Sequence, residues 1–184
     1  MDGVDVRDMT QKELRDKLGY VPQKGVLFSG TIDSNIRYGK PEITDAQVKE
    51  AAEVAQATEF IDTKPEKYES PVSQGGTNVS GGQKQRLSIA RAIAKDPEIF
   101  IFDDSFSALD FKTDSQLRKA LKEYTKDATT VIVAQRISTI LGADQIIVLD
   151  DGHMAGIGTH KELMANCEVY QQIARSQLSE EELA

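Results

Sequence analysis

Two adjacent carboxylates, Asp103 and Asp104, follow four apolar residues, Ile99–Phe102, in the stretch IFIFDDSFSALD. A short apolar run that ends in a small polar turn is typical of a buried strand. In open α/β folds, the side chains at the carboxyl ends of the strands face the ligand crevice. Carboxylate oxygens at that edge suit a hard cation such as Mg²⁺ bound to phosphates. The stretch therefore predicts a phosphate-handling site.

A second candidate phosphate contact is the Gly-rich stretch that opens a predicted helix. Gly81 and Gly82 let the backbone approach a ligand closely. The free N–H groups and the positive dipole end of the helix behind them favour an anion. Ser80 and Gln83 add side-chain donors. A Gly-rich helix start predicts an anion contact, but as a general pattern it is a weak signal.

The elements that must position these residues alternate between strands and helices. The pattern of apolar residues predicts strands at 17–22, 99–102 and 129–134, a hairpin around Asp151-Gly152, and helices at 44–61, 84–96 and 113–124. Thr44 and Gln47 predict a capping box at the first helix, and Pro97 ends the second. The block from about 44 to 95 is expected to be entirely helical. We therefore expect an α/β domain with a mostly parallel sheet and an inserted helical subdomain.

Composition narrows the function classes. Of 184 residues, 39% are apolar and 28% charged, which is ordinary for a globular protein, and the net charge of −8 argues against binding nucleic acid or anionic lipid. No apolar run approaches the roughly 20 residues that span a bilayer. The single cysteine, Cys167, excludes an internal disulfide and is expected to be a helix residue without chemistry. His153 and His160 lack partners at metal-ligand spacing, so no zinc site is expected.

Taken together, the motifs resemble the nucleotide-binding domain of exporter-type ATP-binding-cassette (ABC) transporters. The resemblance covers essentially all 184 residues and implies a P-loop NTPase-type α/β core. NVSGGQKQRLSIARA resembles the signature motif, IFIFDD the Walker B strand and SALD the D-loop. The segment that begins at Gln23 resembles the Q-loop, and VIVAQRIST resembles the switch strand and loop, with Gln135 at the switch position.

The resemblance also implies roles for individual residues, with ATP and Mg²⁺ as the cofactors. Gln23 and Asp103 would hold Mg²⁺, and Gln23 would also reach the attacking water. Asp104 and Gln135 would be the catalytic residues. Ser80, Gly81, Gly82, Gln83 and Asp110 would contact nucleotide, the signature residues doing so across a head-to-tail dimer.

Two of these residues depart from the pattern of efficient family members. Asp104 stands where such members carry a glutamate, and a carboxylate that is misplaced by about 1 Å can cost on the order of 10²-fold in rate. Gln135 stands where they carry a histidine; its amide can donate to a phosphate oxygen but cannot become a cation. Both changes spare ATP binding and impair turnover. We therefore expect a degenerate site, with an intact signature that completes the site of a different partner chain; a slow homodimeric transporter is the competing interpretation.

A further departure is that no G-x-x-x-x-G-K-[ST] phosphate loop occurs in the sequence. We expect the chain to be the C-terminal part of a nucleotide-binding domain, incomplete at its N-terminus and lacking a central strand. It would then be inactive alone and prone to aggregate through an unpaired strand edge. Its expected segments are a Q-loop region at 1–43, a helical subdomain at 44–96, the rest of the core at 97–178 and a loose tail at 179–184.

The leading functional interpretation is the ATPase part of an exporter at the cytoplasmic face of the membrane, with a second nucleotide-binding domain and a transmembrane domain as its partners. One alternative is a soluble ABC-type ATPase acting on DNA or ribosomes, which the negative charge and the exporter-like LFSGTI disfavour. Another is a non-enzymatic dimerisation module. Nucleotide binding separates the first interpretation from the third, and co-purification with a membrane subunit separates the first from the second.

Overall fold

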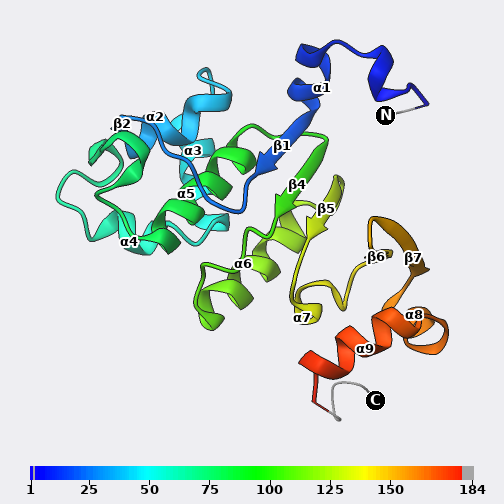
Figure 1. Ribbon diagram of the computed structural model, residues 1–184. Helices are drawn as coiled ribbons and strands as arrows, with labels where there is room; N and C mark the ends of the chain where they lie inside the picture. The colour runs from blue at the N-terminus through cyan, green and yellow to red at the C-terminus, as the bar shows by residue number, and fades with distance from the viewer. Residues whose placement is uncertain (2, 180–184) are drawn as a thin grey trace. The chain divides into compact units, whose positions relative to one another are not determined.

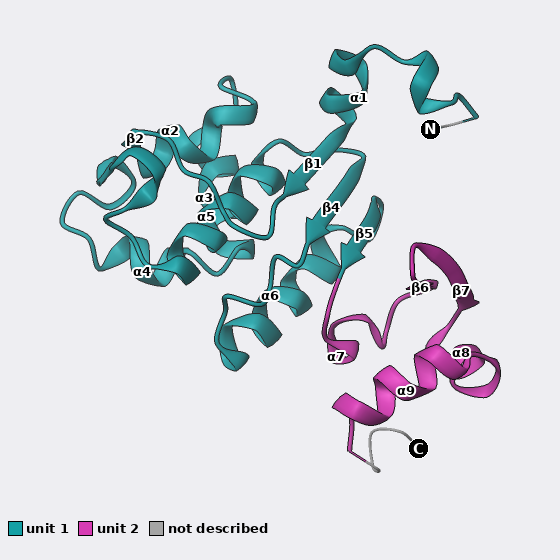
Figure 2. Ribbon diagram, in the orientation of Figure 1, with its two compact units in different colours: residues 1–133 teal, residues 134–184 magenta. Residues whose placement is uncertain are grey.

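A computed structural model describes residue 1 and residues 3–179 of the chain (Figure 1). The chain divides into two compact units, one up to Val133 and one from Ala134 onward (Figure 2). Each unit has its own hydrophobic core. The predicted tail falls almost wholly outside the described residues, since only Ser179 of the range 179–184 belongs to them.

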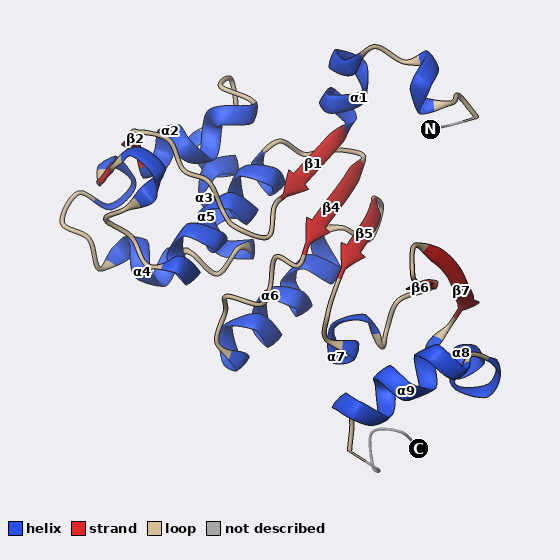
Figure 3. Cartoon of the chain, viewed as in Figure 1, coloured by secondary structure: helices blue, strands red, loops and turns tan. Residues whose placement is uncertain are grey.

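The first unit contains a three-stranded parallel sheet with the order β1-β4-β5 (Figure 3). Its strands are β1 (Leu18–Val21), β4 (Ile99–Asp103) and β5 (Thr129–Val133). Phe100 and Phe102 alternate along β4 and are almost fully buried, as expected of a strand that packs into the core. All three strands lie where the apolar runs predicted them, and the expected α/β class with a parallel sheet is confirmed.

Helices make up most of the rest of the described part of the first unit. They are α1 (Gln11–Lys17), α2 (Ile32–Ile36), α3 (Asp45–Val54), α4 (Thr58–Asp62), α5 (Gly81–Ala94) and α6 (Phe111–Tyr124). The capping box of Thr44 and Gln47 is present at α3. Leu117 and Leu121 are buried on one face of α6, as their spacing predicts.

Two predictions for the region from 44 to 95 are wrong. The single helix expected over 44–61 is broken, because Gln56 has a left-handed backbone with φ of 55° between α3 and α4. The region is also not entirely helical. A short strand, β3 (Pro71–Val72), pairs antiparallel with β2 (Gly30–Thr31).

The second unit packs a hairpin and three helices around a smaller core. Its elements are α7 (Ile137–Ile140), β6 (Ile146–Asp150), β7 (His153–Gly158), α8 (His160–Asn166) and α9 (Glu168–Gln177). The predicted hairpin is confirmed, with positive φ at both Asp151 and Gly152. Cys167 is buried, and it lies between α8 and α9 rather than within a helix, where it was expected.

Candidate functional site

The residues that follow β1 and β4 form one cluster at the carboxyl edge of the sheet. Gln23 Nε2 donates a 2.9 Å hydrogen bond to Asp104 Oδ2, and the Tyr20 hydroxyl donates a 3.0 Å bond to Asp103 Oδ2. These contacts follow from the register, because Val21 of β1 lies opposite Phe102 of β4 and the two parallel strands end side by side. The structure therefore brings together Gln23, Asp103 and Asp104.

The turn after β4 is held by backbone contacts that fix both carboxylates. Asp104 has a left-handed backbone with φ of 45°, a conformation that aspartate tolerates better than most residues. Its amide donates to the Val133 carbonyl at 2.9 Å. The buried hydroxyl of Ser105 donates to the Val21 carbonyl at 2.8 Å, and the Ser107 hydroxyl donates to the Asp104 carbonyl at 3.0 Å. The turn is thus joined to both neighbouring strands, which limits how far either carboxylate can move.

A second cluster lies at the start of α5. The Ser80 hydroxyl accepts the Gln83 amide at 3.2 Å, and Gln83 Oε1 accepts the Ser80 amide at 3.1 Å, which together make a capping box. This box uses the acceptor side of both side chains, so the Ser80 hydroxyl proton and Gln83 Nε2 make no hydrogen bond to the described residues. The first turn of α5 also contacts the SALD segment, since a Cβ on Gly82 would lie 3.5 Å from the Ala108 carbonyl.

Gly81 and Asp110, both expected to contact nucleotide, differ in their surroundings. Open space surrounds the Gly81 α-carbon on its side-chain face, which leaves room for a ligand or a partner chain. Asp110 caps α6 and accepts from the Thr113 amide at 3.0 Å and from the Thr113 hydroxyl at 2.7 Å. These two bonds lower the pKa of the Asp110 carboxyl. Within the described residues Asp110 thus has a helix-capping role, and its contact with nucleotide stays a prediction.

Gln135 belongs to the second unit. Its side chain is exposed, and its carbonyl accepts a 2.9 Å hydrogen bond from Gln177 Nε2. The predicted site residues therefore fall into three places: the sheet-edge cluster, the start of α5 with the adjoining SALD segment, and the loop at Gln135.

Three residues that hold the first cluster were not predicted from the sequence. Tyr20 bonds Asp103, and this bond raises the pKa of the Tyr20 hydroxyl. Gln85 bonds both sides of the loop that carries Gln23, accepting the Gly25 amide at 2.9 Å and donating to the Pro22 carbonyl at 3.1 Å. Arg91 donates to the Val26 carbonyl at 2.8 Å.

A signal for two of them is present in the sequence. Gln85, Ser88 and Arg91 are polar residues that recur at every third position of the helix, and residues at this spacing lie on one face. In the structure this face contacts the Gln23 loop. A Cβ on Gly25 would lie 2.6 Å from Ser88 Oγ, so the loop passes α5 too closely for any larger residue.

In the described residues, no group of three or more His, Cys, Asp or Glu side chains lies close enough together to hold a metal ion. Among the helices of the described part, none combines the length and the apolar character needed to cross a bilayer.

Comparison with known proteins gives consistent results. A family model described as "ABC transporter" matches residues 1–107. The chain is 46% identical over 180 residues to an uncharacterised ABC transporter ATP-binding protein of Mycobacterium bovis, covering 96% of this chain and 31% of that protein. It is 44% identical to a putative multidrug export ATP-binding/permease protein of Staphylococcus aureus, covering 94% of this chain and 30% of that protein.

A solved structure of a bacterial Atm1-family ABC exporter with ATP bound is also similar. It superimposes with a TM-score of 0.93 at 40% sequence identity, covering 97% of this chain and 32% of that chain. The chain thus spans about a third of the length of the relatives that it matches.

Proposed function

This chain belongs to the ABC transporter family, and from that premise we propose that it is the ATP-binding and ATP-hydrolysing portion of an exporter. The observation that carries the proposal is the contact between Gln23 and Asp104 across neighbouring strand ends. It places an amide and two carboxylates at the sheet edge where open α/β folds bind ligands. The relatives named for multidrug export support export as the direction of transport.

The side chains of the sheet-edge cluster fit Mg²⁺ and ATP as cofactors. Because Gln23 uses its nitrogen to bond Asp104, its side-chain oxygen remains a possible ligand. The second carboxylate oxygen of Asp103, which does not accept from Tyr20, is the other. Mg²⁺ prefers oxygen ligands and usually keeps several waters and substrate phosphates, so two protein oxygens suffice. When bound, the ion would neutralise phosphate charge; Gln23 and Asp103 would orient it.

We propose further that this site binds ATP better than it hydrolyses it. Asp104 is one methylene shorter than the glutamate of efficient members, and the turn after β4 is bonded to both β1 and β5. The backbone therefore cannot easily advance the carboxylate to make up the missing length. Gln135 can donate to a phosphate oxygen but carries no charge. Both features favour retention of ATP over turnover.

The start of α5 would serve the site of a second nucleotide-binding domain. Ser80 and Gln83 retain unused donors, and Gly81 is open to solvent, which is the arrangement expected of a surface that meets a partner's nucleotide. An intact start of α5 beside an impaired sheet-edge cluster favours a partner of different sequence over a second copy of this chain. A transmembrane domain that contacts the Gln23 loop would place the assembly at the cytoplasmic face of a membrane.

Two other functions predict different behaviour. A soluble ABC-type ATPase would not co-purify with a membrane subunit. A non-enzymatic dimerisation module would dimerise without any response to nucleotide. Because the 184 residues contain no phosphate loop, we expect the isolated chain to show no binding of Mg-ATP by calorimetry up to millimolar concentration, and no ATPase activity.

The decisive test substitutes two helix-capping residues, Ser80 and Thr44, one at a time in the assembled exporter that carries this chain. Ser80→Ala and Thr44→Ala each remove one capping box from one helix of the first unit, at a similar cost of about 1 kcal/mol in stability. We expect Ser80→Ala to lower steady-state ATP hydrolysis at least about tenfold, because it removes a donor to the partner's nucleotide. Thr44→Ala should leave the rate within about twofold.

The same assay tests the degenerate site. Asp104→Ala should change the rate by less than about twofold, because this site contributes little turnover, whereas Asp104→Glu together with Gln135→His should raise it. Equal decreases in the rate of ATP hydrolysis for Ser80→Ala and Thr44→Ala would show that the start of α5 has only a structural role. ATP hydrolysis by the isolated chain that is abolished by Asp103→Ala would contradict the proposal that it needs its partners.

A further inference from the structure

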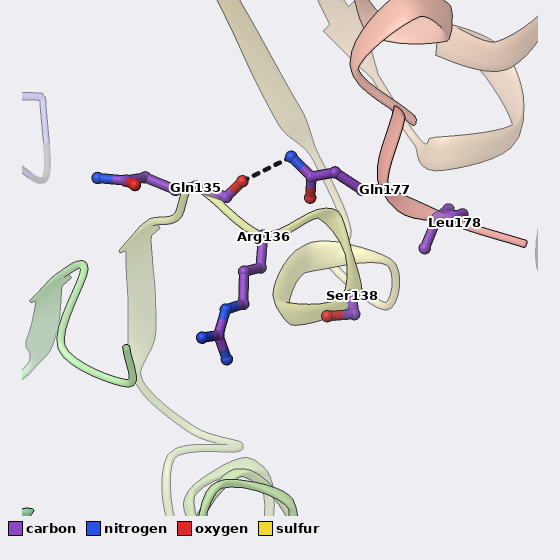
Figure 4. A pocket seen from close by; sticks show the side chains of 5 residues that line it. All are labelled: Gln135, Arg136, Ser138, Gln177 and Leu178. Carbon is purple, nitrogen blue, oxygen red and sulfur yellow. Dashed lines mark hydrogen bonds between the residues drawn. The ribbon is translucent and has the colours of Figure 1, made fainter. Parts of the chain in front are cut away.

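Gln177, the last residue of α9, uses both ends of its side-chain amide to hold the loop at Gln135. Its Nε2 donates to the Gln135 carbonyl at 2.9 Å, and its Oε1 accepts the Ile137 amide at 2.8 Å (Figure 4). The side chain thus bonds a carbonyl and an amide two residues apart, as the N–H and C=O of one residue do in a parallel β-ladder. Forty residues separate Gln177 from Ile137, so the contact is fixed by tertiary structure.

The loop depends on this contact because its own elements are too small to fix it. α7 has only four residues, and a helix of that length does not form on its own. Its N-cap residue, Arg136, provides no side-chain cap, so the free amide at the start of α7 finds its acceptor in Gln177. Gln177 therefore acts as a cap supplied from a distant helix.

The helix that carries Gln177 is well packed. Tyr170 and Ala174, on the same helix, are almost fully buried in the core of the second unit, and the next residue, Leu178, is also buried. A side chain on a well-packed helix keeps its polar atoms within a narrow range of positions. When the two bonds are formed, this helix therefore positions the backbone of the loop.

The contact holds the backbone of Gln135 and leaves its side chain available. In Figure 4 the Gln135 carbonyl faces Gln177, whereas the Gln135 side chain points away from it. That side chain is exposed and makes no hydrogen bond to the described residues. A ligand can therefore reach the Gln135 amide without breaking the contact with Gln177.

We propose that Gln177 is a positioning residue for the nucleotide contact of Gln135. The proposal rests on the function proposed above, in which Gln135 donates to the γ-phosphate. A misplacement of about 1 Å would weaken that hydrogen bond strongly, so the affinity of this site for ATP over ADP depends on Gln177 although Gln177 does not touch the nucleotide. The C-terminal helix α9 thereby determines how firmly ATP is held.

The first measurement is amide hydrogen exchange of residues 135–140 in the chain itself. Gln177→Ala removes both bonds, whereas Gln177→Glu keeps the acceptor for Ile137 and loses the donor to Gln135. The matched control is Gln172→Ala, because Gln172 is exposed on the same helix and bonds Glu168 of that helix at 3.4 Å. We expect the Ile137 amide to exchange about tenfold faster in Gln177→Ala, by a smaller factor in Gln177→Glu, and unchanged in Gln172→Ala.

The second measurement is the ratio of ATP to ADP affinity at this site in the assembled exporter. Gln135→Ala and Gln177→Ala should each lower the ratio by about tenfold, because each removes or weakens one hydrogen bond to a charged phosphate oxygen. The ratio in the double variant should be no lower than in Gln135→Ala. A role of Gln177 in stability alone would lower expression or melting temperature and leave the ratio unchanged.

The outcomes separate this inference from the proposed function. If Gln135→Ala lowers the ratio and Gln177→Ala behaves like Gln172→Ala, the positioning role is overturned while the role of Gln135 stands. If Gln135→Ala leaves the ratio unchanged, the role of Gln135 fails. The exchange data then test Gln177 by themselves. Faster exchange of the Ile137 amide in Gln177→Ala would show that Gln177 still orders the loop, and unchanged exchange would show that it does not.

Discussion

The Gln23 loop and the Gln135 loop are each held by another glutamine, but the two holding residues differ in burial. Gln85 bonds the Pro22 carbonyl and the Gly25 amide, and its side chain is 2% exposed. Gln177 bonds the Gln135 carbonyl and the Ile137 amide, and its side chain is exposed. The same amide chemistry thus holds both loops, once in the core and once at the surface.

The difference in burial decides how easily each loop can be released. A buried amide that loses its partners cannot turn to water, so breaking the Gln85 contacts leaves unpaired polar groups in the core. Water can replace the bond between Gln177 and the Gln135 carbonyl at little cost, because that bond is exposed; the bond to the amide of the buried Ile137 is only partly accessible to water. Arg91 also reinforces only the first loop, through the Val26 carbonyl. We infer that the Gln135 loop opens more readily than the Gln23 loop.

Of the substitutions that test this difference between the two loops, Arg91→Ala is expected to cause the largest loss of stability. Arg91 donates to the Val26 carbonyl and to both side-chain and backbone oxygens of Asn35, each at 2.8 Å, and its guanidinium lies over the rings of Phe28 and Tyr38. Its loss should lower the free energy of unfolding of the first unit by about 3 kcal/mol, because three charge-assisted bonds disappear and a space remains.

Chemical denaturation gives this value, and Arg175→Ala is the control. Arg175 lies exposed near the end of α9, so its removal should cost less than about 0.5 kcal/mol. A similar small loss for Arg91→Ala would mean that the Gln23 loop does not depend on its buried contacts, and the contrast between the two loops would disappear.

Gln85→Leu is expected to lower the free energy of unfolding of the first unit by a smaller amount, about 2 kcal/mol. Leucine fills a similar volume but satisfies neither the Gly25 amide nor the Pro22 carbonyl, and both lie against α5 where water has little access. The matched substitution is Gln116→Leu on α6, where the glutamine is exposed and the cost should stay within about 0.5 kcal/mol. A neutral result for Gln85→Leu would show that the loop finds other partners, and burial would then not explain its order.

The long-range contacts that fix these loops are also what sequence reasoning could not provide. Local patterns were sufficient for β1, β4 and β5, for the capping box at Thr44 and for the hairpin at Asp151-Gly152. They failed at Gln56, where no local signal marks the end of α3. There the Gln56 carbonyl leaves the helix and accepts a 2.7 Å bond from Arg86, a residue 30 positions further along the chain.

The candidate site shows the same division. The apolar run before Asp103 and the Gly-rich start of α5 could be predicted, because each depends on a few adjacent residues. The bond between Gln23 and Asp104 follows from the pairing of β1 with β4, which brings together residues 81 positions apart. The contacts of Gln85 and Gln177 depend on helix packing, and the residue pattern within each loop does not predict them.

The smallest effect on stability is expected from Gln177→Ala, and it is the one that tests the contrast most directly. The lost bond to the Gln135 carbonyl is exposed to water, the lost bond to the Ile137 amide is partly buried, and alanine favours the helix more than glutamine does, so the free energy of unfolding of the second unit should fall by no more than about 1 kcal/mol. The second unit has its own core, so its transition must be followed with a local probe, for example exchange of amides in β6 and β7. A loss as large as that of Gln85→Leu would mean that the second loop is held as firmly as the first. A small loss combined with faster exchange at Ile137 would mean that Gln177 orders the loop without contributing to global stability, which is the behaviour required of a contact that opens and closes while the unit stays folded.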